Sequence, residues 1–287
     1  MLPLAVRLCR VSLKSRLPGT YRFAKWLAHS YRPLQCAPII SLGSVVYLDL
    51  RVPGSFDLLE NPDRDIYERN LIRSLVKRSY IVFDIGANVG LYTATVSPLV
   101  TKVYAFEPNP ALHPQLSMTC KQLGNAELVT VALSDTAGET SLFAPIDHSM
   151  ASLRDWTGGS TSALTCHTAR LDDLNLPLAD FIKCDVEGAE LNVFRGAQET
   201  IRQARPTIFY EANAASVRAF NQSISAATDF LRELVPEYSF YRLCGDGSLR
   251  ELRGFDFRHA NLLATVFPVL QSATASLTTN PGFPSEC

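Results

Sequence analysis

Acidic side chains follow five apolar segments of this sequence, at the point where each segment ends. They are Asp84, Glu107, Asp135, Asp185 and Glu211. A carboxylate can accept hydrogen bonds from ribose hydroxyls, bind an ammonium group or remove a proton from a reacting group. If the apolar segments are parallel strands, their carboxyl ends share one edge of a sheet, where ligands bind. We therefore expect the five carboxylates to line a ligand site along that edge.

A glycine loop follows the first of these segments. It reads Asp84-Ile85-Gly86-Ala87-Asn88-Val89-Gly90. Gly86 would let the backbone turn tightly and approach a ligand closely. The dinucleotide fingerprint G-x-G-x-x-G holds a pyrophosphate, but here Asn88 stands where its second glycine would be. The loop is better suited to a ligand with an amino-acid tail, whose ammonium group Asp84 could bind directly or through water.

Two further strand ends could bind an adenosine group on the same ligand. Glu107 lies about 20 residues after Gly86, where an acidic residue can accept hydrogen bonds from both ribose hydroxyls. Asp135, together with Ser134, could meet an adenine amino group. The alternative is an ordinary glycine turn beside solvated carboxylates. The predicted cofactor-binding residues are Asp84, Gly86, Ala87, Asn88, Gly90, Glu107, Pro108, Ser134 and Asp135.

Alternating strands and helices must position these residues. The apolar runs have the length of buried strands, and helical periodicity follows the first, second and fourth of them. Gly124 is placed as the C-terminal cap of the second such helix. This alternation predicts an α/β fold, a doubly wound and mostly parallel sheet with helices on both faces. The runs span residues 80–83, 102–106, 128–133, 181–184 and 207–210.

The segments between and after these runs carry weaker signals. Residues 43–60 alternate loosely around Pro53-Gly54, which predicts a β-hairpin with its turn there. Residues 138–170 are rich in Ser, Thr and Gly and indicate a loop region with short strands. Further strands are expected near 238–252 and 262–267.

The two ends of the chain differ from its middle. No Asp or Glu occurs before Asp49, while residues 1–40 are basic and indicate a helical extension. That extension could pack on the domain or contact an anionic membrane, and it lacks the apolar run of a secretory signal or a membrane span. We expect a core domain at 41–270 and a flexible tail at 271–287.

Composition narrows the class of protein. Hydrophobic residues make up 47% of the chain and the formal net charge is −1, so a large core is expected and a nucleic-acid partner is not. The seven cysteines are scattered and form no C-x-x-C pair. This argues against a disulfide framework and a structural zinc site, and for a reducing compartment, so we expect a cytoplasmic protein.

Five segments resemble the FkbM-type methyltransferases. They are residues 82–90, 105–108, 132–135, 171–174 and 181–190, and the Lys-x-Asp-x-Glu-Gly-Ala-Glu pattern of the last is the most specific. The likeness runs from about Asp49 to Phe267 and leaves residues 1–40 outside. Cys184 stands where the family usually has Ile or Met.

This resemblance implies a Rossmann-like class I methyltransferase fold with S-adenosyl-L-methionine as cofactor. It implies O-methylation of a hydroxyl on a sugar, a glycolipid or a natural product. The expected partner is a small-molecule or glycan acceptor, and the oligomeric state stays open. Two alternatives also stay open, namely a nitrogen or carboxylate acceptor and a protein that binds an adenosyl ligand but has lost catalysis.

Four residues are the catalytic candidates for such a reaction. Lys183, Asp185 and Glu187 alternate along a strand and its exit, and Glu211 ends a following strand. Asp185 is the first choice for positioning or deprotonating the acceptor. Lys183 could hold a carboxylate ionised, bind the acceptor or form a purely structural ion pair, and Glu187 could instead cap a helix. The spacing of these carboxylates matches no dedicated metal loop, so no metal site is predicted.

Two other classes of enzyme fit the sequence less well. A nicotinamide-dependent oxidoreductase would want the full dinucleotide glycine pattern and a Tyr-x-x-x-Lys proton donor, and neither is present. A nucleic-acid methyltransferase would want an Asn/Asp-Pro-Pro-Tyr motif or a broad basic face, whereas the basic residues gather only at the N-terminus.

Overall fold

The apolar runs form one central sheet of eight strands in the computed structural model, which describes residues 3–14, 19–145, 150–159 and 161–269. The strand order is β12-β11-β13-β10-β9-β3-β4-β5, and the five strands from β10 to β5 are parallel to one another. The strands are β3 (Ile81–Ile85), β4 (Lys102–Phe106), β5 (Ala126–Val129), β9 (Phe181–Cys184), β10 (Thr207–Asn213), β11 (Ser239–Leu243), β12 (Leu249–Glu251) and β13 (His259–Thr265). The predicted α/β fold class is confirmed.

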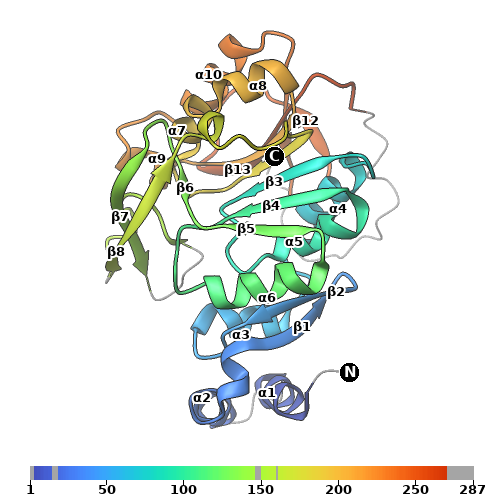
Figure 1. Cartoon of the computed structure of the whole chain (residues 1–287), viewed down its shortest axis with the longest axis vertical. Coiled ribbons are helices and arrows are strands. Elements are labelled where there is room, and N and C mark those ends of the chain that lie inside the picture. The colour runs from blue at the N-terminus through green and yellow to red at the C-terminus, as the bar shows by residue number, and fades with distance from the viewer. Residues whose placement is uncertain (1–2, 15–18, 146–149, 160, 270–287) are drawn as a thin grey trace.

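Helices cover both faces of this sheet (Figure 1). Alternate residues of each strand point to opposite faces, so Phe83 and Ile182 enter one apolar cluster while Val82 and Phe181 enter another. The first face carries α7 (Glu190–Arg195), α8 (Gln198–Ala204) and α10 (Ala226–Leu234), and the second carries α4 (Ile66–Leu75), α5 (Leu91–Val96) and α6 (His113–Leu123). Short helix α9 (Ala214–Ala219) follows β10.

The helix ends follow the local sequence closely. Gly124 caps α6 in the left-handed conformation, as predicted, and its amide donates to the Cys120 carbonyl. The helix expected around residues 191–201 is instead two helices that break at Gly196. A Cβ on Gly196 would lie 1.9 Å from the Ser134 carbonyl oxygen, so this glycine lets the two segments touch.

The predicted hairpin lies earlier in the chain than the sequence indicated. Strands β1 (Ala37–Ser41) and β2 (Ser44–Leu48) pair around Leu42-Gly43, where both residues have positive φ. Such φ values suit a two-residue hairpin turn, whereas the segment beginning at Pro53 forms helix α3 (Pro53–Glu60) because proline is well suited to the first turn of a helix.

The third predicted strand divides between two sheets. Residues 126–129 form β5 of the central sheet, whereas β6 (Ala132–Leu133) joins a separate three-stranded sheet with β8 (Thr161–Ala169) and β7 (Gly138–Pro145). The region 138–170 therefore holds a long antiparallel hairpin, which extends at the side of the molecule in Figure 1. The prediction of a loop with short strands was wrong here, because cross-strand pairing outweighs weak local patterning.

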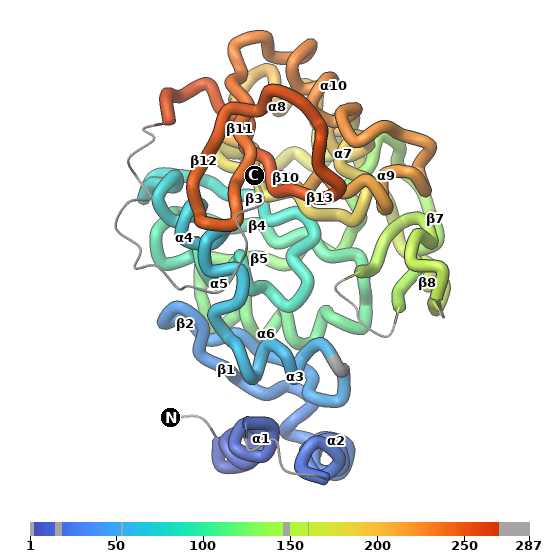
Figure 2. The backbone as a smooth tube through the Cα atoms, turned by 180° about the vertical axis from the view of Figure 1, so that it is seen from behind, coloured from blue at the N-terminus to red at the C-terminus, as the bar shows by residue number. Residues whose placement is uncertain are grey.

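The basic N-terminal segment forms two helices, α1 (Leu4–Lys14) and α2 (Thr20–Ser30), followed by the 3-10 turn η1 (Arg32–Cys36). They make a layer at one end of the molecule, visible from both sides in Figures 1 and 2. Val6 and Ala24 enter the same apolar cluster as Leu58 of α3 and Leu91 of α5. The helical part of the prediction for residues 1–40 is thus present, and the extension packs on the domain. The tail expected at 271–287 lies outside the described residues.

Two further findings concern the chain as a whole. Among the described residues, the structure contains no helix with both the length and the apolarity to span a bilayer. Cys9, Cys36, Cys120, Cys166 and Cys184 are free thiols.

Candidate active site

The carboxyl ends of β3 and β9 meet where the winding of the sheet reverses. From β3 the chain continues outward to β4 and β5, while β9 and β10 lie on its other side. Ligands of open α/β sheets bind at this position. The loops after the two strands touch here, because a Cβ on Gly86 would lie 1.9 Å from the Asp185 carbonyl oxygen. Gly86 also has a φ of +76°, so the predicted glycine is required both by conformation and by space.

Two cavities open at this switch point. A cleft of about 810 Å³ runs toward the N-terminal segments, and a pocket of about 50 Å³ lies on the side of β4. The residues that line both are Gly86, Asn88, Asp185 and Glu187. The two cavities are therefore neighbours that share one wall.

Glu107 forms the polar part of the small pocket. Its two carboxylate oxygens accept hydrogen bonds from the backbone amides of Asn88 and Asn109, both at 2.8 Å. Burial raises the pKa of Glu107 to about 7, although these amides act in the opposite direction. Each oxygen keeps a further lone pair, so the side chain can still accept bonds from a ligand's hydroxyls.

Apolar side chains form the rest of the small pocket. They include Ile85, Phe106, Pro108, Val131 and Leu142. A flat aromatic base suits such walls, and a vicinal diol suits the Glu107 carboxylate. The donor set therefore fits an adenosyl ligand.

Five of the nine predicted cofactor residues line at least one of the two cavities. They are Gly86, Ala87, Asn88, Glu107 and Pro108. Asp84 does not. Its side chain is buried within β3, where it accepts a hydrogen bond from Thr93 at 2.6 Å and lies 3.6 Å from the Lys183 ammonium. Asp84 was predicted to bind a ligand's ammonium group. In the structure it lies beneath the site, where it contacts Thr93 and Lys183.

Gly90, Ser134 and Asp135 also lie outside the cavity walls. A Cβ on Gly90 would lie 2.8 Å from a methyl group of Leu116, so this glycine allows α5 and α6 to pack closely. Ser134 and Asp135 follow β6 of the small sheet, and the Ser134 hydroxyl bonds to Asp135 at 3.2 Å. The expectation that Asp135 shares the carboxylate edge was wrong, because the strand before it leaves the central sheet.

Lys183 is buried beneath the shared wall with several partners. Its ammonium donates to the Gly86 carbonyl oxygen at 2.9 Å and lies 3.5 Å from the Asp185 carboxylate. It also lies 5.1 Å from the centre of the Tyr92 ring. Burial alone would lower the pKa of Lys183, but Asp185 and Asp84 outweigh it and the pKa is raised. Lys183 therefore stays charged and ties the glycine loop to the strand that carries Asp185.

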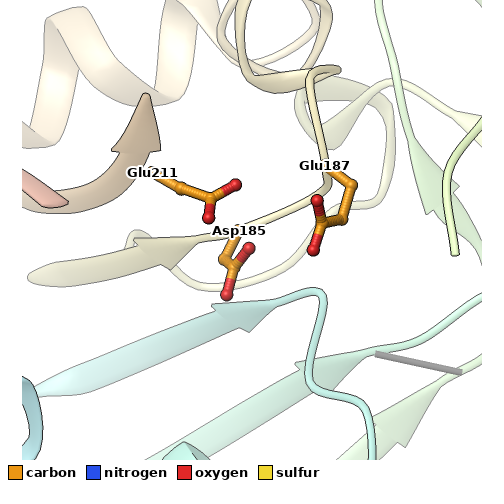
Figure 3. Close-up of side chains that lie close together, drawn as sticks. All are labelled: Asp185, Glu187 and Glu211. Carbon is orange, nitrogen blue, oxygen red and sulfur yellow. The ribbon is translucent and has the colours of Figure 1, made fainter. Parts of the chain in front are cut away.

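Three predicted catalytic carboxylates meet at the cleft wall. Asp185, Glu187 and Glu211 offer oxygen atoms that all lie within 4.8 Å of one another (Figure 3). Asp185 follows β9, and Glu211 extends from β10 beyond the last parallel pair of that strand with β9. Oxygen donors of this kind suit Mg²⁺ or Ca²⁺, although the sequence predicted no metal site. The sequence predicted all three carboxylates as site residues. They lie close together because β9 and β10 are neighbours in the sheet.

Repulsion within the cluster controls its protonation. Burial and the neighbouring Glu211 and Asp185 carboxylates raise the pKa of Glu187 to about 10. Burial also raises the pKa of Glu211, against the effect of its hydrogen bond with His259. Glu187 therefore holds a proton at neutral pH and can donate a hydrogen bond.

Two residues that the sequence argument missed complete the cluster. His259 on β13 lies 2.7 Å from a Glu211 oxygen, and this bond raises the pKa of the imidazole. Glu190 is buried and accepts hydrogen bonds from the amides of Val186 and Gly188, so it holds the loop that carries Glu187. An acidic residue in the first turn of a helix was the available signal for Glu190. His259 had none, because its position depends on the pairing of β10 with β13.

Charged and polar side chains line the wider cleft. Arg51 forms a bidentate pair with Asp49, and Arg64 contacts Asp65. Glu68 and Asn261 also line the cleft, although they lie far apart in the sequence. The other lining residues include His29, Ser55, Tyr92 and Gln115. A cleft of this composition suits a ligand with many hydroxyl groups.

One family model matches more than half of the chain. This model, described as the methyltransferase FkbM domain, matches residues 84–240. The hexuronic acid methyltransferase AglP of Haloferax volcanii is 27% identical over 143 residues, which cover 47% of this chain and 58% of that protein. The chain thus spans less than two thirds of the length of this relative.

Solved structures were also compared. A methyltransferase FkbM from Methylobacillus flagellatus KT has a TM-score of 0.45 and 15% identity, covering 75% of this chain and 53% of that one. A precorrin-6y C5,15-methyltransferase from Geobacter metallireducens GS-15 has a TM-score of 0.42 and 16% identity, covering 70% and 89%. From the family match, which includes the glycine loop, Glu107 and the carboxylate cluster, it follows that this chain belongs to the FkbM methyltransferase family.

Proposed function

We propose that this protein transfers a methyl group from S-adenosyl-L-methionine to a hydroxyl oxygen of a sugar-containing acceptor. One observation carries the proposal. Asp185 and Glu187 line both the small pocket beside Glu107 and the large cleft. A methyl donor held in the pocket and an acceptor held in the cleft would meet at these two side chains.

The pocket residues have separate parts in binding the cofactor. Glu107 would accept hydrogen bonds from the ribose hydroxyls, and Phe106, Pro108 and Val131 would enclose the base. The backbone of the loop at Gly86 would hold the amino-acid tail. When bound, S-adenosyl-L-methionine supplies a methyl group on an electron-poor sulfur.

The cleft residues would prepare the acceptor hydroxyl. Asp185 would accept the hydroxyl proton, and the Lys183 ammonium at 3.5 Å stabilises its negative charge. Protonated Glu187 would donate a hydrogen bond to a neighbouring acceptor oxygen and so orient it. Glu211, held by His259, would accept from a second hydroxyl. The acceptor oxygen would bond to the methyl carbon while the carbon–sulfur bond breaks, so that S-adenosylhomocysteine leaves and the hydroxyl proton passes to Asp185.

A sugar acceptor is supported by the cleft and by the relative. Arg51, Arg64, Glu68 and Asn261 offer donors and acceptors in the arrangement that hydroxyl-rich ligands use. The archaeal relative is named for methylating a hexuronic acid, a sugar with a carboxylate. The two arginines would bind such a carboxylate by exchange of their present acidic partners.

The test has a binding arm and a transfer arm. Titration calorimetry compares S-adenosylmethionine, S-adenosylhomocysteine and NAD, and we expect the two adenosyl ligands to bind while NAD does not. Transfer of a labelled methyl group is then measured to oligosaccharides with and without hexuronic acids, with mass spectrometry locating the methylated atom. Adenosyl binding without transfer to any acceptor would favour a binding protein, and methylation at nitrogen or a carboxylate would refute the hydroxyl assignment.

A further inference from the structure

The N-terminal helix pair carries large apolar side chains that are exposed on its surface. Leu4, Leu8 and Val11 lie exposed on α1, with 71%, 46% and 67% of their surface accessible. Phe23 and Trp26 lie exposed on α2, where their rings are 5.9 Å apart. We call these five residues, together with the basic residues defined below, the helix-pair surface.

These side chains point away from the protein core for a geometric reason. On α1 the exposed residues 4, 8 and 11 repeat at helical spacing, and the buried residues Val6, Cys9 and Leu13 occupy the opposite side. On α2 the buried residues Ala24 and Ala28 are likewise opposite Trp26. Each helix therefore uses one face for the core and leaves a second apolar face outside.

The charge around these apolar faces has a single sign. Arg7, Lys14, Arg22 and Lys25 are exposed on the same two helices. No Asp or Glu occurs in the sequence before Asp49, so no carboxylate on either helix neutralises them. Figures 1 and 2 show both helices side by side as the outermost layer at one end of the molecule.

We propose that the helix-pair surface docks on an anionic lipid bilayer. Apolar and aromatic side chains would enter the boundary between headgroups and acyl chains, and the arginines and lysines would contact anionic headgroups. Tryptophan is favoured at that boundary because its ring is apolar and its N–H is polar. A second protein copy fits less well, because two such surfaces would place like charges against each other.

The docked surface has a direct relation to the cleft. His29 at the end of α2 lines the cleft, together with Asp49 and Arg51 from the segment after β2. Docking would therefore bring one wall of the cleft close to the lipid surface. The lipid-binding proposal itself stands apart from the proposed methyl transfer, since binding is measured without cofactor or acceptor.

The experiment is co-sedimentation of the full-length protein with vesicles. Pure phosphatidylcholine vesicles are compared with vesicles that also contain phosphatidylglycerol, at low and high salt. We expect binding to the anionic vesicles only, weakened by salt. The combined variant Leu8→Ser, Val11→Ser, Trp26→Ser should lower the partition coefficient at least tenfold, and Arg7→Gln, Lys14→Gln, Lys25→Gln should lower it about 100-fold.

A matched control removes apolar side chains elsewhere. Met118 and Leu178 are also exposed, so the variant Met118→Ser, Leu178→Ser should bind vesicles like the wild type. Circular dichroism and thermal melting of every variant establish that it is folded. Equal binding to neutral and anionic vesicles, or wild-type binding by the helix-pair variants, would overturn the proposal. Concentration-dependent dimerisation that the apolar variant abolishes would assign the surface to a second copy instead.

Discussion

The small pocket at Glu107 and the large cleft beside it are built in different ways. The polar part of the pocket comes from two successive strand–loop units, in which the backbone amides of Asn88 and Asn109 hold the Glu107 carboxylate. The cleft gathers side chains from distant segments, among them Arg51, Glu68, Asp185 and His259. A local motif can specify the first arrangement, whereas the second exists only once the sheet has assembled. Changes in the two regions should therefore separate cofactor binding from catalysis.

The largest expected effect belongs to the cleft. Asp185→Asn should lower kcat about 1,000-fold, because loss of a positioned general base typically costs that much. The dissociation constant of S-adenosylhomocysteine should change by less than about threefold, since the role proposed for the Asp185 side chain is to accept the acceptor's proton and none of the proposed cofactor contacts uses it. Methyl transfer and calorimetry measure the two quantities. The exposed Asp173→Asn variant is the control, and unchanged kcat in Asp185→Asn would remove Asp185 from the reaction.

The pocket should respond in the opposite manner. In the wild type, each Glu107 oxygen accepts a hydrogen bond from a backbone N–H. In Glu107→Gln, the side-chain NH₂ group must face one of these N–H donors, which leaves both without an acceptor. The ribose hydroxyls also lose a charged acceptor. We expect S-adenosylhomocysteine to bind about 10- to 100-fold more weakly, with kcat at saturating cofactor changed much less. Calorimetry checks the first and initial rates the second. The control is Glu127→Gln, a change of an exposed side chain on β5.

Two glycines outside the pocket test how the helix packing behind it contributes to stability. Both Gly90 and Gly124 have positive φ, but only at Gly90 would a Cβ collide with a neighbour, the Leu116 side chain. Gly90→Ala should therefore lower the free energy of unfolding by about 2–3 kcal/mol, against about 1 kcal/mol for Gly124→Ala. Urea denaturation measures both. Equal losses would show that the packing of α5 on α6 adjusts without cost.

The smallest expected effect is a pH dependence of stability that originates in the carboxylate cluster. The pKa of Glu187 is raised from 4.5 to about 10, so the folded protein holds a proton that the unfolded chain releases. Stability should be complete below about pH 4.5 for this group and decline as pH rises toward 10. In Glu187→Gln, the loss of unfolding free energy with rising pH should be smaller by about 1 kcal/mol. The difference is this small because neighbouring carboxylates share the proton. Denaturation across pH measures it, with exposed Glu233→Gln expected to follow the wild type.

Much of the fold could be predicted because its signals are local. Short apolar runs predicted the parallel strands, and Gly124 predicted the end of α6. The prediction failed where pairing partners decided the outcome, as in the hairpin of residues 138–169 and in β6. Which sheet a strand joins depends on which sheet edge is free to pair with it. The periodic pattern of its sequence does not contain that information.

The sequence by itself determined most members of the candidate site, and the tertiary structure decided what each of them contacts. Gly86, Glu107 and Asp185 were named from their types and their places after apolar runs, and Lys183 from its place inside one. Only the folded chain placed Asp84 beneath the site and removed Asp135 from it. The pairing of β10 with β13 brought His259 to Glu211, and the strand order brought the carboxylates within 4.8 Å of one another. The physical reason is that residue type sets what a side chain can do, while strand order and register set what it meets.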